Sequence, residues 1–271
     1  MKPPARRVEI WGVLNVTPDS FSDGGRWLEP AAAVEQGLRL AQEGADVLDV
    51  GGESTRPGAA EVPVEEEVRR TAPVIEALRR AGLSLPISID TRKAAVARSA
   101  LDAGATIVND VSAGRHDPAL LDLVAERHAG LVLMHMLGEP ATMQRAPSYG
   151  DVVAEVAAFL EQRLGAARSA GIAAERLWID PGLGFGKTLE HNVALLAGLE
   201  RFVAQGRVLL GASRKSFLGA LTGRLAPERL LGSLACAARA AQAGVAAVRV
   251  HDVAPTRELL EVLSRIAPVL R

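Results

Sequence analysis

The sequence has few aromatic residues, a single cysteine and no long apolar run. Aromatics are 3% of its 271 residues, so the 48% that are hydrophobic must form an aliphatic core. The lone Cys236 excludes a disulfide framework and indicates a reducing compartment, which we expect to be the cytoplasm. No apolar run approaches the ~20 residues of a membrane span, and the N-terminus lacks a signal-peptide core, so we expect no membrane association.

The sequence also lacks an excess of positive or negative charge. The 31 Lys and Arg residues balance 32 Asp and Glu residues, giving a formal net charge of −1. Neither basic nor acidic blocks occur, and this excludes an extended nucleic-acid surface. A local basic site for a small anion is compatible with this balance.

Short apolar runs rich in β-branched residues alternate along the chain with longer amphipathic segments. Most of these runs are continuously apolar, as is typical of parallel strands buried on both faces. The predicted strands are Val8–Val16, Asp46–Val50, Pro86–Asp90, Thr106–Asp110, Gly130–His135, Leu177–Asp180, Arg207–Gly211 and Ala246–His251. The predicted helices are Pro30–Glu43, Val64–Ala81, Arg92–Ala103, Pro118–Arg127, Asp151–Ala170, Leu189–Ala204, Pro227–Ala243 and Pro255–Ala267.

This alternation predicts an α/β fold, a (β/α)8 TIM barrel forming a single domain over residues 1–271. The length is ordinary for such a barrel, and no linker or low-complexity segment divides the chain. A doubly wound open sheet is the alternative fold. That fold usually carries a glycine-rich nucleotide fingerprint after its first strand, and none follows Val8–Val16.

Polar residues suited to binding or catalysis stand at the end of nearly every predicted strand. In an α/β barrel the active site forms at the C-terminal ends of the strands. Solvated loops would explain one or two such residues, but not most of them. The strand-end groups are Asn15, the segment 51–56, Asp90, Asn109, Asp110, His135, Asp180, the segment 213–215, Arg249 and His251.

Two glycine-rich loops, 15–25 and 51–58, carry hydroxyl groups and suit closure over an anion. A third stretch, 182–188, resembles a Walker A loop, but Pro181 stands where that motif needs its first glycine, which argues against a nucleotide triphosphatase. The histidines show no spacing typical of metal ligands. His135 is left without an assigned role.

Several long and unusual stretches lie at these strand ends. They read GVLNVTPDSFSDGG, DVGGESTRPG, ISIDTRK, IVNDVSAG, LMHM, DPGLGFGK, GASRKSFLG and RVHDV. In content and order they resemble the dihydropteroate synthase family along nearly the whole chain. The resemblance implies condensation of 6-hydroxymethyl-7,8-dihydropterin pyrophosphate with p-aminobenzoate, giving 7,8-dihydropteroate and pyrophosphate. It also implies Mg2+ as cofactor, sulfonamide sensitivity and a homodimer built through late, alanine-rich helices such as 234–243.

The resemblance assigns each substrate group to residues of this chain. Pterin binding is assigned to Asp90, Asn109, Met134, Asp180, Phe185, Lys215 and Arg249. Pyrophosphate binding is assigned to Asn15, Thr55, Arg249 and His251, with Asn15 also contacting Mg2+. Binding of p-aminobenzoate is assigned to Phe21, Thr55, Arg56, Pro57 and Ser216. The catalytic role is given to Asp90, Lys215, Arg249 and His251.

These residue types make chemical sense of the assignments. The Asp180 carboxylate can accept two N–H bonds from the guanidine-like edge of a pterin, and the Asn109 amide can match a mixed edge. Cationic groups oppose the charge that builds on departing pyrophosphate. An SN1-like step without a dedicated general base fits an electron-rich pterin and a weakly basic aromatic amine.

Two other functions are compatible with a pterin-binding barrel. A methyltransferase of the corrinoid type would share the Asp and Asn contacts but would leave Asn15, Thr55 and the 213–215 and 249–251 groups unexplained. A catalytically silent pterin-binding homologue, acting as a scaffold, should have lost loop residues that are intact here. A turnover assay with both substrates separates the three functions.

Overall fold

The computed structural model describes residues 7–17, 30–54 and 58–266. Eight parallel strands close into a barrel in the order of the sequence, from β1 round to β8 and back. The strands are β1 (Glu9–Asn15), β2 (Val47–Gly51), β3 (Ile87–Asp90), β4 (Ile107–Asp110), β5 (Gly130–Met134), β6 (Leu177–Asp180), β7 (Arg207–Leu210) and β8 (Ala247–Val250). The predicted (β/α)8 barrel is confirmed.

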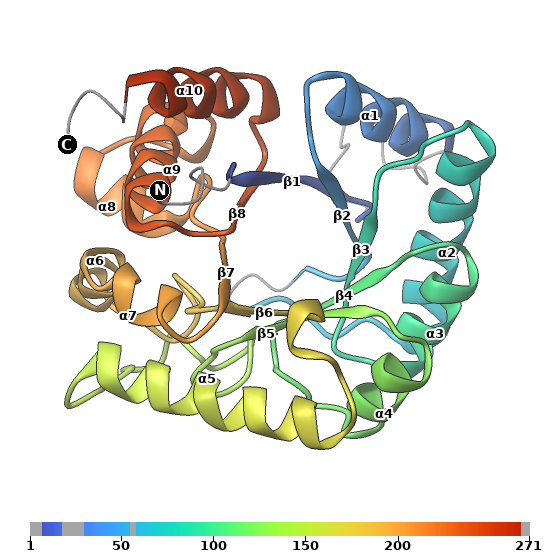
Figure 1. Ribbon diagram of the computed structural model, residues 1–271, viewed down its shortest axis with the longest axis horizontal. Coiled ribbons are helices and arrows are strands. Elements are labelled where there is room, and N and C mark those ends of the chain that lie inside the picture. The colour runs from blue at the N-terminus through green and yellow to red at the C-terminus, as the bar shows by residue number, and fades with distance from the viewer. Residues whose placement is uncertain (1–6, 18–29, 55–57, 267–271) are drawn as a thin grey trace, which may run out of the picture.

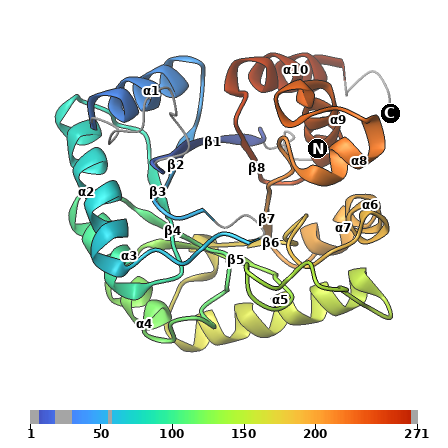
Figure 2. The ribbon, with the colours of Figure 1, turned by 180° about the vertical axis from the view of Figure 1, so that it is seen from behind.

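Helices form an outer ring around the strands, as the two opposite views show (Figures 1 and 2). They are α1 (Pro30–Gln42), α2 (Val64–Arg80), α3 (Ala94–Asp102), α4 (Ala119–Glu126), α5 (Val152–Ser169), α6 (Leu189–Ala197), α7 (Leu199–Val203), α8 (Ser216–Thr222), α9 (Leu230–Ala243) and α10 (Val253–Ile266). Two short 3-10 helices, η2 (Ala174–Arg176) and η3 (Ala226–Glu228), complete the set. Within the described ranges, no helix is long and apolar enough to cross a membrane.

Helix boundaries differ from the prediction in the second half of the chain. The segment predicted as one helix over 189–204 is two helices, because Gly198 interrupts it with φ −94° and ψ 21°. A side chain at Gly198 would come within 3.1 Å of Val153 on α5, so the break allows close packing there. The helix predicted from Pro227 begins at Leu230, and the short helix α8 precedes it.

The barrel interior is filled by a layer of apolar side chains near the N-terminal ends of the strands. Trp11 of β1 and Trp178 of β6 meet edge to face with ring centroids 5.5 Å apart, although their strands are not neighbours in the sheet. Their contact therefore runs across the interior, as in the packed layers of other α/β barrels. The buried members of the layer are Trp11, Val47, Ile107, Val132, Trp178, Leu209 and Ala247.

Side chains along a strand alternate between two faces, so the residue two positions further on also points inward. Two positions beyond the apolar layer, towards the C-terminal ends of the strands, the character of the side chains changes. The residues there are Val13, Asp49, Asn109, Met134, Asp180, Gly211 and Arg249. The fold thus stacks a largely polar layer on an apolar floor at the barrel mouth where active sites form.

Candidate active site

Arg249 is the centre of the polar layer. Its Nε donates to Asp49 Oδ2 at 2.5 Å, and its Nη2 donates to Asp90 Oδ2 at 2.8 Å. Asn109 Nδ2 donates to the same Asp49 oxygen at 3.2 Å. The structure therefore brings together Asp90, Asn109 and Arg249, which the sequence predicted to share a site.

Asp49 is a site residue that the sequence analysis missed. It lies inside β2, is fully buried, and contacts two of the predicted site residues. In the sequence it can be noticed only as a carboxylate within the apolar run VLDVG. A charged residue in a strand buried on both faces needs a partner, so its presence there indicates a buried polar contact. The strand-end pattern did not reveal it, since it lies two positions before the last residue of the strand.

Burial raises the pKa of Asp90 to about 7, opposed by the charge of Arg249 and reinforced by the neighbouring carboxylates Asp49, Glu67 and Asp110. Burial also opposes the charge of Arg249, but Asp49 and Asp90 outweigh it and raise the guanidinium pKa above its ordinary value. Arg249 is therefore a permanent cation beside a carboxylate that titrates near neutral pH.

Asp180, at the end of β6, and Lys215, in the loop after β7, line the mouth beside Arg249. Asp180 Oδ1 accepts a hydrogen bond from the backbone N–H of Gly182 at 2.7 Å, and Lys215 Nζ donates to the Leu183 carbonyl. A methyl group at Gly211 would stand 3.6 Å from Asp180 Oδ2 and 3.7 Å from Lys215 Nζ. The absent side chain at Gly211 therefore leaves open space between this carboxylate and this ammonium group.

The pKa values of these two groups depend on one another. Burial raises the pKa of Asp180, opposed first by the charge of Lys215 and then by the Gly182 N–H. Burial lowers the pKa of Lys215 to about 8, opposed by the charge of Asp180. The pair offers an acceptor and a donor side by side, as a ring with adjacent N–H and carbonyl groups requires.

Phe185 and Met134 supply the apolar side of the mouth. Met134 is buried in a small cluster with Val111, Met136 and Met143, and the half-buried Phe185 packs against it. The Lys215 ammonium lies 4.7 Å from the centre of the Phe185 ring. The structure places both residues beside Lys215 and Asp180, and their contacts with a pterin stay predictions.

The loop that carries Phe185 is held to the end of β5 by Lys187, another residue without a predicted role. Lys187 Nζ lies 2.9 Å from His135 Nδ1 and donates to the Phe185 carbonyl at 3.0 Å. A Cβ at Gly182 would lie 1.9 Å from the His135 carbonyl oxygen, so only glycine allows this approach. Burial lowers the pKa of His135 to about 3, so it is neutral at physiological pH and serves the loop rather than a proton transfer.

His251 and Ser216 lie at the ends of β8 and β7. His251 Nδ1 is 3.1 Å from Ser213 Oγ, which also accepts the His251 N–H at 3.2 Å. Ser216 is exposed and is the first residue of α8. Arg214, beside them, pairs with Asp252 instead of lining the mouth.

The two glycine-rich loops are described in part. Phe21, Thr55, Arg56 and Pro57 lie outside the described residues, so their assigned contacts stay predictions.

The base of the second loop is held by a buried ionic network that the sequence analysis did not predict. Lys93 Nζ donates to Glu53, to Glu67 at 2.8 Å and to the Val62 carbonyl at 2.6 Å. Burial would raise the pKa of Glu53, but Lys93 and Arg92 outweigh it and hold that pKa below its ordinary value. The network therefore joins both ends of the segment 54–61 to the end of β3.

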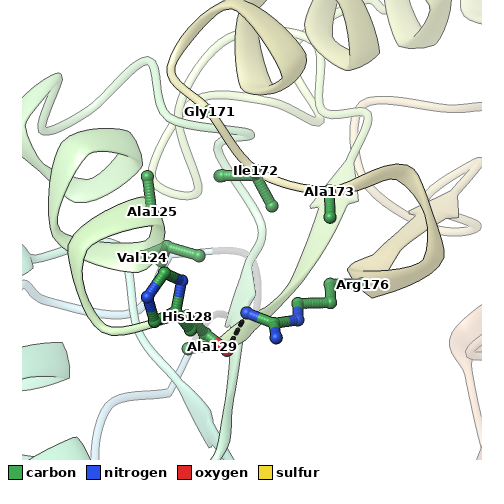
Figure 3. Close-up of a pocket in the computed structure, with 8 residues that line it drawn as sticks. All are labelled: Val124, Ala125, His128, Ala129, Gly171, Ile172, Ala173 and Arg176. Atoms are coloured by element: carbon green, nitrogen blue, oxygen red, sulfur yellow. Dashed lines mark hydrogen bonds between the residues drawn. The ribbon is translucent and has the colours of Figure 1, made fainter.

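A separate hollow of about 130 Å3 lies at the opposite end of the barrel, where α4 ends and β5 and β6 begin (Figure 3). Its lining residues are Val124, Ala125, His128, Ala129, Gly171, Ile172, Ala173 and Arg176. Arg176 Nη1 donates to the His128 carbonyl at 2.6 Å. Because the chemistry of α/β barrels takes place at the other end, we assign the active site to the polar mouth and not to this hollow.

A barrel whose mouth pairs carboxylates with an amide, an ammonium and a guanidinium, beside apolar side chains, defines an enzyme site for a planar ring rich in N–H groups. The pterin binding enzyme family matches residues 11–251. The chain belongs to that family, and within it to the dihydropteroate synthases.

Similar proteins support this branch. The dihydropteroate synthase of Mycobacterium leprae is 50% identical, over 94% of this chain and 92% of its own length. The Xanthomonas albilineans dihydropteroate synthase with 4-aminobenzoic acid is 54% identical, covers 96% of this chain and 93% of its own, and superposes with a TM-score of 0.90. The Yersinia pestis enzyme in a sulfonamide drug complex is 41% identical, over 97% and 95% of the two chains, with a TM-score of 0.91.

Proposed function

We propose that the protein condenses 6-hydroxymethyl-7,8-dihydropterin pyrophosphate with p-aminobenzoate, releasing 7,8-dihydropteroate and pyrophosphate. The observation that carries the proposal is the arrangement of Asp180, Lys215, Asn109 and Asp90 around one barrel mouth, in a member of the dihydropteroate synthases. The test is a turnover assay with both substrates, and with methyltetrahydrofolate as the rival substrate. A corrinoid-type methyltransferase is not favoured, because the similar proteins are dihydropteroate synthases.

The mouth offers complementary groups to each part of the pterin. Asp180 Oδ2 faces the space above Gly211, where it can accept ring N–H groups, while Lys215 beside it can donate to a ring carbonyl or nitrogen. Phe185 and Met134 cover the ring with apolar surface. The ring is thereby oriented and its methylene carbon is held towards the mouth.

Departure of the pyrophosphate builds negative charge on the leaving group. Arg249 would supply positive charge there, and His251 and Thr55, assigned with it by resemblance, would supply hydrogen-bond donors. The positive charge on the methylene is delocalised into the electron-rich ring, and the aromatic amine then attacks. The amine is a weak base, so its proton is lost to solvent after the C–N bond has formed.

Mg2+ fits this site as a metal held largely by the substrate. Among the residues that the structure describes, no group of three or more His, Cys, Asp or Glu side chains is placed to hold a metal ion. A Cβ at Gly51 would lie 3.7 Å from Asn15 Oδ1 and 3.9 Å from Asp90 Oδ2, so these oxygens flank an open niche. Oxygen donors of this kind suit Mg2+ when phosphate oxygens and water complete its shell. Bound there through Asn15, the metal would neutralise charge on the pyrophosphate.

The free protein should therefore bind Mg2+ weakly, and tight binding should need pyrophosphate. Calorimetric titration of Mg2+ with and without saturating pyrophosphate measures this, and we expect at least a tenfold difference in affinity. Asn15→Ala should reduce the difference, because it removes the only side chain that we assign to the metal. Full turnover after thorough chelation would contradict the role of the metal.

Sulfonamides should compete with p-aminobenzoate, because both present an aniline ring and an acidic group. We place their shared pocket between the start of α8, at Ser216, and the loop residues Phe21, Thr55, Arg56 and Pro57. Initial rates measured against varied p-aminobenzoate should show a raised KM with unchanged kcat, and a pterin–sulfonamide adduct should form. Purely noncompetitive inhibition would exclude a shared pocket.

Two copies of the chain are proposed to pair through the surface of α8 and α9. Leu221 on α8, Leu225 just before η3 and Leu231 on α9 expose 55%, 72% and 78% of their surface, more than the other large hydrophobics that the structure describes. Exposed leucines gathered on neighbouring elements favour a protein interface. Sedimentation should give a dimer, and Leu225→Glu with Leu231→Glu should give a monomer. Leu137→Glu, at an exposed leucine outside this surface, is the control that should stay dimeric. A wild-type monomer at micromolar concentration would rule out this interface.

A further inference from the structure

Arg249 is held at two different depths. Its Nε bonds to Asp49, which is fully buried on β2, while its Nη2 bonds to Asp90 at the end of β3. The Arg249 side chain keeps 22% of its surface exposed and the Asp90 side chain keeps 10%, against 0% for Asp49. One end of the guanidinium is therefore held by a fully buried carboxylate, and the other end by a carboxylate that solvent partly reaches.

The two carboxylates are not fully satisfied by this arrangement. Asp49 Oδ1 and Asp90 Oδ1 are both buried without a hydrogen-bond partner. Leaving an acceptor unpaired in a buried site is costly, so such an atom at the mouth indicates where a donor arrives with a ligand. Asp90 stands in the mouth assigned to the pterin ring, whose N–H groups are suitable donors.

The Asp49 end is fixed independently of any ligand. Asn109 Nδ2 donates to Asp49 Oδ2, the same oxygen that accepts from Arg249 Nε. This second bond orients the carboxylate, and the complete burial of Asp49 leaves it little freedom to turn. The Nε–Asp49 contact can thus act as a pivot for the guanidinium.

We propose that Arg249 exchanges partners during binding, with Asp49 as the fixed pivot. In the free protein Nη2 is held by Asp90. When a pterin N–H donates to Asp90, the hold of that carboxylate on Nη2 weakens, and Nη2 turns to the pyrophosphate. Asp49 is then a positioning residue that keeps Arg249 in reach. This inference rests on the proposed function and deepens it, because it makes pterin recognition strengthen pyrophosphate binding.

The coupling has a physical origin in shared charge. Two carboxylates bonded to one guanidinium largely neutralise its positive charge, so the group attracts a third anion only weakly. Releasing one carboxylate makes that charge and the freed N–H available to the anion. Because coupling between two ligands is reciprocal, pyrophosphate must also tighten pterin binding by the same factor. The expected factor is about fivefold or more, within the usual range for linked sites.

A matched pair of variants separates this exchange from simple electrostatics. Asp90→Ala and Asp49→Ala each remove one carboxylate bonded to the same guanidinium. Electrostatics alone predicts that both bind pyrophosphate more tightly. Partner exchange predicts opposite changes in calorimetry with Mg2+ and pyrophosphate: about fivefold tighter for Asp90→Ala, because Nη2 is already released, and about tenfold weaker for Asp49→Ala, because the pivot is lost.

Two further measurements complete the test. Asp49→Asn keeps an oxygen acceptor for Nε, so its pyrophosphate affinity should lie within about threefold of wild type. Adding saturating 6-hydroxymethylpterin should tighten pyrophosphate binding by the wild-type protein. It should leave the pyrophosphate affinity of Asp90→Ala unchanged. Melting curves check that each variant is folded. If Asp49→Ala proves unfolded, the affinities of Asp90→Ala and Asp49→Asn for pyrophosphate decide between partner exchange and simple electrostatics.

The inference is overturned if Asp90→Ala binds pyrophosphate no more tightly than wild type, or if Asp49→Ala binds it more tightly. These are binding measurements on the protein without turnover. A wild-type protein that forms dihydropteroate but shows no coupling would therefore refute the exchange and keep the function. Coupling without turnover would refute the function alone.

Discussion

Asp180→Asn should bind 6-hydroxymethylpterin about a hundredfold more weakly than wild type, a loss of roughly 3 kcal/mol. In the structure one carboxylate oxygen accepts the Gly182 N–H. The asparagine oxygen would take the place of Oδ1 and keep that bond. The new NH2 group would then take the place of Oδ2 and face the space above Gly211, where the ring N–H groups arrive. Two donors would then face each other in a buried site. Calorimetry with the pterin measures the loss.

Asp110→Asn is a matched control for this variant. Asp110 is equally buried, but its oxygens accept from Ser112 and from the Gly114 N–H within its own loop. Its substitution should lower the melting temperature and leave pterin affinity within a fewfold of wild type. Near-normal pterin affinity in Asp180→Asn would remove that carboxylate from the pterin site.

Lys215→Met should lower kcat/KM for the pterin pyrophosphate by about 10²- to 10³-fold, the usual effect of removing one preorganised donor. Methionine keeps the length of the side chain but has no ammonium. Burial lowers the Lys215 pKa to about 8, so the charged form prevails below that pH and is lost above it. In wild type, kcat/KM should fall as the pH rises through about 8, and the variant should lack this alkaline limb.

Lys187→Met serves as the control, since it removes another buried ammonium whose contacts are His135 and the Phe185 carbonyl. Burial lowers the Lys187 pKa to about 7. We expect this variant to lose stability and to keep the limb near pH 8. If Lys215→Met retains the alkaline limb, another group is responsible for it.

The barrel could be predicted from sequence because most strands are short, continuously apolar runs that alternate with longer amphipathic segments. The strand-end residues Asn15, Asp90, Asn109 and Asp180 could be grouped in advance, since parallel strands in a closed barrel end at one mouth. Their order along the sequence is also the order of their strands around the barrel. No tertiary information was needed to bring them together.

Asp49 could not be found in the same way. Its importance depends on the barrel closure that places it in the polar layer beside Arg249, which lies 200 residues away in sequence. Helix boundaries near Gly198 were missed for a similar reason, because the break reflects contact with Val153 on another helix. The contacts assigned to Phe21, Thr55, Arg56 and Pro57 rest on the family resemblance, because these residues lie outside the described ranges.

The most direct test of the account is the stoichiometry of products formed by the wild-type protein with both substrates and Mg2+. Pyrophosphate and 7,8-dihydropteroate are measured in the same sample over time. The proposed condensation predicts equal amounts of the two products. When p-aminobenzoate is omitted, neither product should form. Pyrophosphate released without dihydropteroate would describe a hydrolase, and tight pterin binding with no release at all would describe a binding protein; either result would contradict the proposed condensation.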